Sequence, residues 1–328
     1  ASDVYKRQTT DIATAKCSGT RGNDIRIVVA KNIDDDTKYD VTTYLGTKEV
    51  DKQTVKEVRE LVKEWKKNGE TVGFVPTMGY LHEGHGSLIT KARENNDKVV
   101  VSIFVNPMQF GPTEDLEAYP RDFEADCKLC ESIGAAMVFH PEPSEMYAPD
   151  FCTWVDMDVL SKTLCGKSRP IHFRGVCTVV SKLFNIVTPD RAYFGQKDAQ
   201  QLAIIRRMVR DLNMDIEIVG CPIVREEDGL AKSSRNTYLN EEERKAALIL
   251  SKAVFLGKKM VEDGETSAAA VKEAMIKKIE SEPMAKIDYV EAVDGLSMQP
   301  VEEIKAPVLV AMAVYIGKTR LIDNFIVE

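Results

Sequence analysis

The sequence has no long hydrophobic run. Its most apolar stretch, Val99 to Val105, falls far short of the ~20 residues that a membrane-spanning helix needs. No apolar block follows the charged N-terminal residues Lys6 and Arg7, so we expect no secretory signal. These absences predict a cytoplasmic protein that does not associate with a membrane.

A disulfide framework is also missing. The 7 cysteines are odd in number and irregularly spaced, which is typical of reduced thiols. Cys127 and Cys130 form the only C-x-x-C motif, and they recur at helical spacing with Phe123 and Ile133. This spacing favours core packing over redox or zinc chemistry, because a zinc site would need a second ligand pair that is not evident.

Positive charge is in deficit. Lys and Arg number 44 against 52 Asp and Glu, which gives a net charge of −8. This is the wrong sign for a protein whose main function is to coat nucleic acid or anionic lipid. A local basic pocket is compatible with the balance, and small molecules are the expected partners.

The length of 328 residues exceeds the roughly 250 to 300 at which one hydrophobic core usually stops growing. We divide the chain into a polar N-terminal extension (1–46), a nucleotide-binding part (47–220) and a smaller part (221–328). The extension contains one strand-like stretch, Ile25 to Ala30, and suggests no function. No repeat or low-complexity linker separates the other two parts, so we expect them to pack together with a cleft between them.

Strands and helices alternate in the middle part. It opens with a helix whose capping box is Thr54 and Glu57, and Asn68-Gly69 ends that helix. Alternation of this kind predicts a Rossmann-like α/β fold, a doubly wound parallel sheet with right-handed crossovers. The predicted strands are 71–75, 98–105, 135–139, 191–194 and 215–219, and the predicted helices are 86–93, one within 115–133, 176–187 and 198–212.

The order of the predicted elements changes after Cys221. Two helices, about 241–262 and 266–281, precede strands near 287–293, 308–315 and 321–326. Helices followed by strands predict a small α+β domain.

The most informative segment runs from Val75 to His85, with the letters VPTMGYLHEGH, and connects a buried strand to a helix. A strand-to-helix turn at the carboxyl edge of a parallel sheet is where such folds bind ligands, and a helix N-terminus binds phosphate. His82 and His85 can donate hydrogen bonds to phosphate oxygens. A structural histidine pair and a zinc site are the alternatives, and the three-residue gap does not match the helical zinc-protease motif.

Two further segments place polar groups near the expected sheet edge. Asn106 and Gln109 follow a strand, and their carboxamides suit the hydroxyls and carboxylate of a small polar acid; a simple Asn-Pro turn is the alternative. Arg169 and His172, with Arg174, precede a helix and could form a wall for anions, against the alternative of solvated loop charges.

Two more segments suit a nucleotide. In the stretch Gly195 to Gln201, Lys197 can neutralise phosphate and Asp198 can accept from ribose hydroxyls. The loop from Lys232 to Arg235, with the letters KSSR, offers two hydroxyls and a guanidinium as a mobile clamp for a triphosphate.

The H-x-G-H pattern after a first strand resembles the signature of the adenylyl-transferring superfamily that includes class I aminoacyl-tRNA synthetases. The longer string from Pro76 to His85 is narrower and resembles the pantoate–β-alanine ligase family. The other four segments match that family in the same order, over about residues 70 to 240, and the ending Gly317 to Asp323 resembles its C-terminus.

The resemblance implies an ATP-dependent ligase that condenses pantoate with β-alanine to pantothenate through a pantoyl adenylate, with release of AMP and pyrophosphate. It implies a homodimer, with Mg²⁺ on the phosphates and no evident protein ligand for the metal. The implied catalytic residues are His82, His85 and Lys197. The implied ATP-binding residues are Met78, Gly79, Tyr80, Leu81, His82, Glu83, Gly84, His85, Gly195, Gln196, Lys197, Asp198, Val224, Lys232, Ser233, Ser234 and Arg235. The implied substrate-binding residues are Asn106, Gln109, Arg169, His172 and Gln201.

Three positions depart from the family's usual pattern. Lys232 stands where an apolar residue such as methionine is usual, Gln196 where glutamate is common, and Gly86 where a bulky apolar residue is usual. Two other functions stay open at this point: another adenylyl transferase, and a nucleotide sensor without catalysis. A tRNA enzyme would need a basic face and an anticodon-binding extension, and neither is evident.

Overall fold

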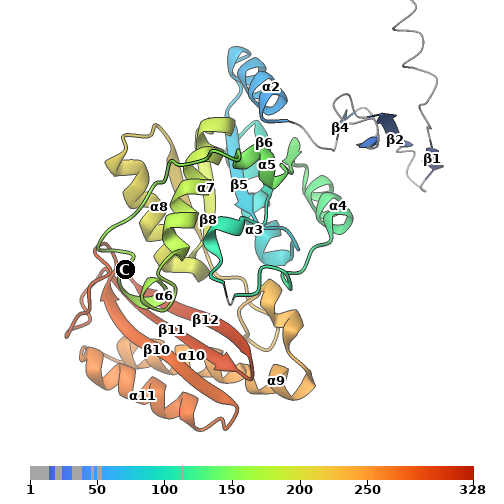
Figure 1. Ribbon diagram of the computed structural model, residues 1–328. Coiled ribbons are helices and arrows are strands. Elements are labelled where there is room, and N and C mark those ends of the chain that lie inside the picture. The colour runs from blue at the N-terminus through green and yellow to red at the C-terminus, as the bar shows by residue number, and fades with distance from the viewer. Residues whose placement is uncertain (1–14, 19–23, 32–38, 46–47, 50–53, 113) are drawn as a thin grey trace, which may run out of the picture.

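The computed structural model describes residues 15–18, 24–31, 39–45, 48–49, 54–112 and 114–328. Figure 1 shows a parallel sheet with helices around it, and below it an antiparallel sheet backed by helices. Within the described residues, no helix is both long enough and apolar enough to cross a membrane.

The central sheet has five parallel strands in the order β7-β6-β5-β8-β9. The chain moves outward from β5 in one direction through β6 and β7, and then in the other direction through β8 and β9. This reversal confirms the predicted doubly wound α/β fold, and it places the topological switch point between β5 and β8. The strands are β5 (Val72–Thr77), β6 (Lys98–Ile103), β7 (Met137–Phe139), β8 (Arg191–Gly195) and β9 (Glu217–Cys221).

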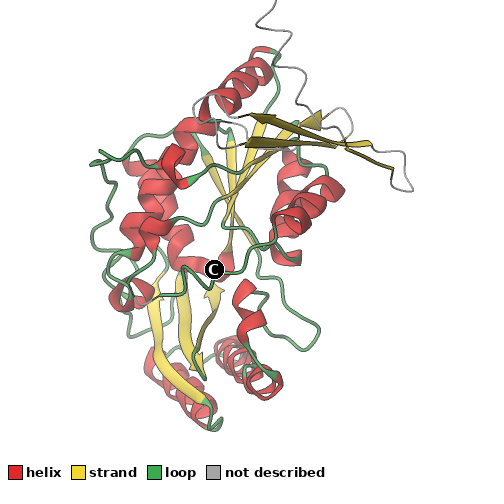
Figure 2. Ribbon diagram, turned by 45° about the vertical axis from the view of Figure 1, so that its right-hand side comes forward, coloured by secondary structure: helices red, strands yellow, loops and turns green. Residues whose placement is uncertain are grey.

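Helices cover both faces of this sheet (Figures 1 and 2). Alternate strand residues face opposite cores: Phe74 and Val100 pack in one core, and Val75 and Val101 in the other. The helices α3 (Glu83–Asn95) and α4 (Phe123–Ile133) belong to the second core. The first core takes α2 (Val55–Lys67), α7 (His172–Val187) and α8 (Ala199–Asp211).

Helix starts in this part are set by their caps. The predicted capping box of Thr54 and Glu57 is present at the start of α2. The helix α3 begins at Glu83, three residues before the predicted start, because His82 caps it and accepts from the N–H of Gly84. His85 therefore lies in the first turn of the helix, and α7 also begins earlier than predicted.

The C-terminal part is a three-stranded antiparallel sheet in the order β10-β11-β12, as the predicted strands indicated. The sheet is buried on both faces: Val310 packs against its own helices, whereas Leu309 and Ala311 join the first core of the parallel-sheet part. The elements are α9 (Glu241–Ala246), α10 (Leu248–Glu262), α11 (Ala268–Glu280), β10 (Ala285–Asp294), β11 (Val308–Ile316) and β12 (Thr319–Val327). The boundary near residue 221 stays a prediction.

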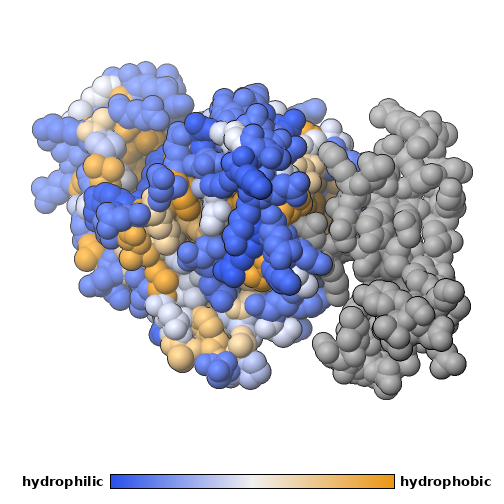
Figure 3. All heavy atoms as spheres, turned by 90° about the horizontal axis from the view of Figure 1, so that it is seen from above, coloured by the Kyte–Doolittle hydropathy of each residue, from blue (hydrophilic) through white to orange (hydrophobic). Residues whose placement is uncertain are grey.

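The N-terminal extension holds more strand than its sequence indicated. In addition to β2 (Asp24–Lys31), which covers the predicted strand, the extension forms β1 (Ala15–Ser18) and β3 (Tyr39–Leu45). With β4 (Lys48–Glu49), just beyond the extension, these strands pair in chain order. Short elements complete the fold: α5 (Pro143–Met146), α6 (Leu164–Ser168) and the 3-10 turns η1 (Pro107–Gln109), η2 (Gln196–Asp198) and η3 (Ser234–Tyr238). Seen from above, hydrophilic and hydrophobic side chains are mixed over the described surface (Figure 3).

Candidate active site

A cavity of about 220 Å³ lies at the carboxyl ends of β5 and β8. Segments from both sides of the switch point line it, together with the loop that follows β9. Among the residues named from sequence, those that line it are Met78, His82, Gly84, His85, Asn106, Gln109, Gly195, Lys197, Asp198, Gln201, Val224, Lys232, Ser233, Ser234 and Arg235.

His82 and His85 lie side by side one helical turn apart, with ring centroids 4.2 Å apart and ring planes tilted by 42°. The Nδ1 atom of His82 accepts from the backbone N–H of Gly84 at 3.1 Å, and the Nδ1 atom of His85 accepts from the backbone N–H of His82 at 3.3 Å. A neutral imidazole whose Nδ1 accepts carries its proton on Nε2. Each ring therefore has an Nε2–H group as its remaining donor.

Both imidazoles are neutral at ordinary pH. Burial, with the nearby charges of Lys197 and Lys232, lowers the pKa of His82 to about 4. Burial, then His82 and Lys197, lowers the pKa of His85 to about 3. Lys197 and Lys232 bring positive charge to the histidine pair, and each lies beside a carboxylate, Asp198 at 3.8 Å and Glu83 at 3.2 Å.

The backbone at Lys197 is held by the C-terminal sheet. The side chain of Asn324, on β12, is buried and donates to the carbonyls of Gln196 and Lys197 at 3.1 and 2.9 Å. The neighbouring Asp323 is 1% exposed and accepts two hydrogen bonds from Arg225, whose backbone pairs with Ala231 just before residues 232–235. Strand β12 therefore positions two of the segments that the sequence assigned to ATP.

The clamp loop, residues 232–235, contacts the parallel-sheet part. Ser234 is buried and its hydroxyl donates to the carbonyl of Tyr80 at 3.2 Å. Arg235 forms two hydrogen bonds with the carboxylate of Asp115, at 2.9 and 3.0 Å. Lys232 is paired with Glu83 at 3.2 Å, although the Glu83 side chain is 75% exposed. The loop therefore closes over the start of α3.

Asn106 is 1% exposed and all of its hydrogen-bonding positions are used. It donates to Gln109 Oε1 and to the carbonyl of Gly175, and it accepts from the N–H of Met108 and from Tyr147. Gly175 lets α7 approach closely, because a Cβ there would lie 2.4 Å from the Met108 carbonyl oxygen. Asn106 and Gly175 therefore fix the position of Gln109.

Arg169 and His172 lie elsewhere. They line a larger cavity of about 850 Å³, between the parallel-sheet part and the C-terminal sheet. Arg169 is paired with Glu114 through both carboxylate oxygens, and His172 Nδ1 lies 3.1 Å from the carbonyl of Gln109. Their contact with a substrate stays a prediction. Both cavities are bordered by Lys197, Asp198, Gln201, Ser233 and Arg235.

The remaining predicted residues do not line the smaller cavity: Gly79, Tyr80, Leu81, Glu83 and Gln196. Conversely, sequence reasoning did not select several residues that do, namely Thr77, Phe104, Tyr119, Val176, Val179, Val180, Leu183, Tyr193, Pro222 and Ile223. In the sequence, the four residues from α7 showed only the spacing of a buried helical face. Asp115 and Asn324 were missed because their partners lie more than a hundred residues away in the chain.

No metal centre is evident in the described ranges, where no group of three or more His, Cys, Asp or Glu residues could hold a metal ion. The C-x-x-C pair is part of the core, as predicted: Cys127 and Cys130 are buried beside α3 and β6. Burial raises the pKa of Cys130 to about 12, so its reactive thiolate form is suppressed.

The fold and the cavity together define a doubly wound α/β protein with a pocket at its switch point, beside the start of α3. Residues 52–326 match the family model described as pantoate-beta-alanine ligase. The pantothenate synthetase of Ruminiclostridium cellulolyticum is 69% identical over 272 residues, which cover 83% of this chain and 96% of that protein. That of Enterococcus faecalis is 63% identical over 276 residues, which cover 84% and 98%.

Solved structures agree. The pantothenate synthetase of Thermus thermophilus superposes with a TM-score of 0.80 at 45% identity, over 83% of this chain and 97% of that one. The pantoate-beta-alanine ligase of Francisella tularensis, complexed with beta-gamma ATP and beta-alanine, gives a TM-score of 0.69 at 32% identity, over 84% and 97%. The chain belongs to the pantoate–β-alanine ligase family, and its activity is the ligation that forms pantothenate.

Proposed function

We propose that the enzyme works in two half-reactions, with pantoyl adenylate between them. The pair of neutral imidazoles, each with an Nε2–H group left to donate, carries this proposal. Donors of this kind, next to Lys197 and Lys232, favour oxygens on which negative charge accumulates during phosphoryl transfer. The complex of the Francisella tularensis relative with an ATP compound and β-alanine supports the choice of both ligands.

The chemistry needs no protein nucleophile. A carboxylate resists attack by an amine because oxide is a poor leaving group. In the first half-reaction a pantoate carboxylate oxygen attacks the α-phosphorus of ATP, and the bond to the bridging oxygen breaks to release pyrophosphate. In the second, the amine of β-alanine attacks the acyl carbon, expels AMP and loses a proton. Catalysis then rests on positioning and charge stabilisation.

Within this scheme we assign His82, His85 and Lys197 to the phosphates undergoing transfer. Ser233, Ser234 and Arg235 close on the triphosphate. Asp198 and the backbone near Gly195 take the ribose, and Val224 lies by the adenine. His85, the deeper of the two rings, is assigned as the main hydrogen-bond donor of the pair, and it donates from its Nε2–H group.

Pantoate fits the other wall of the cavity. Gln109 and Gln201 offer carboxamides for its hydroxyls and carboxylate, and Gln109 also lies where β-alanine would approach. Val176 and Val179, from α7, present apolar surface for the two methyl groups of pantoate. A small acid with one apolar and one polar side therefore matches the two kinds of wall.

Magnesium would be held by the nucleotide phosphates, because the described residues supply no cluster of ligands for it. A homodimer remains our prediction from the family, and a cytoplasmic location remains our prediction from the sequence.

The test uses pantoate labelled with ¹⁸O in its carboxylate. An acyl-adenylate route requires one labelled oxygen in the AMP product, because the carboxylate oxygen stays on phosphorus when the amine expels AMP. Unlabelled AMP would refute the route. Omitting pantoate separates this function from another adenylyl transferase: AMP formed without pantoate would favour the latter, and ATP binding without AMP would favour a sensor. We expect replacement of both His82 and His85 by alanine to abolish pantothenate formation in a folded protein.

A further inference from the structure

The turn between β5 and α3 has an unusual backbone. Gly79 and Tyr80 both have positive φ angles, +82° and +52°. The left-handed conformation costs a residue with a side chain about 1 kcal/mol or more, so Tyr80 adopts it only where surrounding contacts compensate. These two residues immediately precede Leu81 and His82, so any relaxation of the turn moves the first imidazole.

A buried carboxylate on another helix holds this turn. Asp126, on α4, is 2% exposed, and its two oxygens accept separate backbone hydrogen bonds. Oδ2 accepts from the N–H of Tyr80 at 2.8 Å, and Oδ1 accepts from the N–H of Leu81 at 2.6 Å. Burial raises the pKa of the Asp126 carboxyl, and the N–H groups of Leu81 and Tyr80 act in the opposite sense.

The turn is packed too closely to adopt another backbone conformation. A Cβ on Gly79 would lie 2.9 Å from Ile103 Cγ2 and 3.1 Å from Asp126 Oδ2. The N–H of Gly79 is bound by Thr77 Oγ1 at 3.2 Å, and Thr77 is itself hydrogen-bonded to the carbonyl of Ser102 at 2.7 Å. The segment is therefore enclosed by β6 on one side and by the Asp126 carboxylate on the other.

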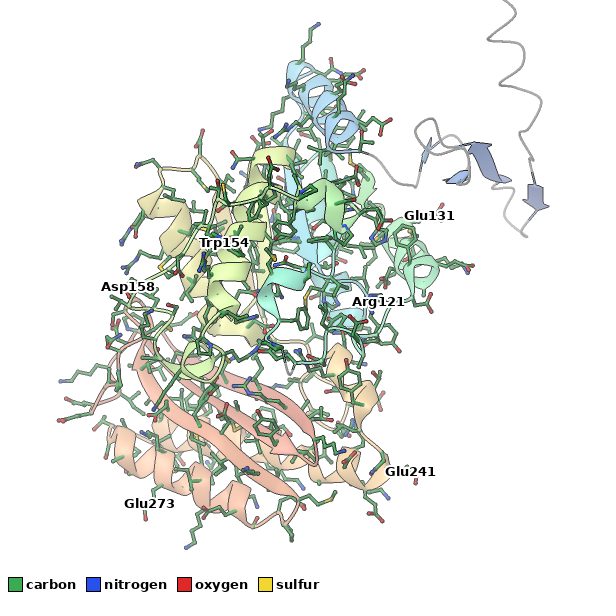
Figure 4. The ribbon with its side chains drawn as sticks, viewed as in Figure 1. Arg121, Glu131, Trp154, Asp158, Glu241 and Glu273 are labelled. Atoms are coloured by element: carbon green, nitrogen blue, oxygen red, sulfur yellow. The ribbon has the colours of Figure 1, made fainter. Side chains whose placement is uncertain are left out.

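The same backbone unit receives the clamp loop. The N–H of Tyr80 donates to Asp126, while the carbonyl of Tyr80 accepts from Ser234. Asp126 thus lies behind both proposed phosphate-binding groups, the histidine pair and the loop from the C-terminal part, without lining the cavity itself. Helices α3 and α4 lie together on one side of the sheet, and Glu131, on the outer side of α4, points away from it (Figure 4).

We propose that Asp126 is a positioning residue for the ligase reaction: it holds the left-handed turn at Tyr80 so that His82, His85 and Ser234 meet the same triphosphate. The carboxylate is suited to this task because it offers two acceptors side by side. An asparagine has one acceptor oxygen, so its NH₂ group would face one of the two backbone donors and leave it unpaired. This inference rests on the proposed function of the site.

The experiment compares Asp126→Asn with Asp122→Asn in the full-length enzyme. Asp122 caps the same helix and is exposed, and asparagine caps as well as aspartate, so the control changes the same chemical group without touching the turn. For Asp126→Asn we expect kcat/KM for ATP to fall by about 100-fold, the effect of a small misplacement of reacting groups. We expect the KM for pantoate to stay within about twofold, because Gln109 and Gln201 belong to other loops.

Hydrogen exchange supplies a readout that general destabilisation would not give. The amides of Tyr80 and Leu81 should lose protection in Asp126→Asn while the other amides of the parallel sheet keep theirs. ATP kinetics like those of the parent, or a KM for pantoate that rises more than about twofold, would overturn the inference. If Asp126→Asn does not fold, Gly79→Ala disturbs the same turn, and parent-like ATP kinetics there would overturn it too. A parent enzyme that forms no pantothenate would refute the proposed function instead.

Discussion

Mild acid should destabilise this enzyme through its buried histidines. Of the 4 histidines, three have pKa values far below the ordinary value of 6.5: His82 at about 4, and His85 and His172 at about 3. In each case burial is the largest cause. The unfolded chain binds protons to these imidazoles near their ordinary pKa of about 6.5, whereas the folded protein does not until the pH is much lower.

The sign and size follow from proton linkage. A histidine whose pKa is lowered by folding favours the unfolded state once the pH falls below the unfolded value, and the loss grows until the folded pKa is reached. Between about pH 7.5 and about pH 5.5, each such imidazole reduces the free energy of unfolding by about 1.4 kcal/mol. Three of them together reduce it by about 4 kcal/mol, a large share of the stability of a typical domain.

Urea unfolding at the two pH values measures this loss, and His172→Gln provides the control. Glutamine can still donate to the Gln109 carbonyl that His172 Nδ1 faces, so the variant removes one titrating group with little other change. We expect its pH dependence to be smaller than that of the parent by about 1.4 kcal/mol. Comparing parent and variant cancels the contribution of the carboxylates. The reasoning fails if the two proteins lose the same stability.

Four other changes test the site. Asp115→Asn should lower the ATP dissociation constant by about fivefold in calorimetry, because Arg235 no longer has to break an ion pair with Asp115, worth ~1 kcal/mol, before it binds phosphate. Weaker binding of ATP would contradict this. Lys232→Met should raise the KM for ATP without abolishing turnover, and unchanged ATP kinetics would remove Lys232 from the clamp. Asn324→Ala should lower kcat/KM for ATP by about tenfold, by freeing two loop carbonyls. Deletion of residues 1–46 should leave pantothenate formation intact, and a folded but inactive truncation would refute this.

Local features of this protein could be predicted from the sequence. The capping box at Thr54 depends on a residue three positions away, and the alternation of apolar runs depends on periods of two and 3.6 residues. The turn before His82, with its glycines and histidines, likewise lies within eleven consecutive letters. Motifs of this length predicted the doubly wound fold and the family, because such motifs depend only on the local backbone structure.

Contacts between distant segments required the tertiary structure. Sequence reasoning placed Arg169 among substrate-binding groups, which stays a prediction, and only the fold shows that its guanidinium is paired with Glu114. Asn106 looked like a ligand for substrate, and its four hydrogen-bonding positions are all taken by protein groups. A side chain of the right type in the right loop does not reveal whether its donors are already satisfied, because the partner can come from anywhere in the chain.

The role proposed for Asp126 could not be predicted from the sequence either. In the sequence it is one acid among many on an amphipathic helix, next to the C-x-x-C pair. Its two acceptors reach backbone donors 45 and 46 positions earlier in the chain, and only the packing of α4 against α3 brings them together. The sequence motifs determined which reaction this chain is built for. The packing of its helices and strands determined which side chains are available to the substrates and which are hydrogen-bonded to other protein groups and hold the site in place.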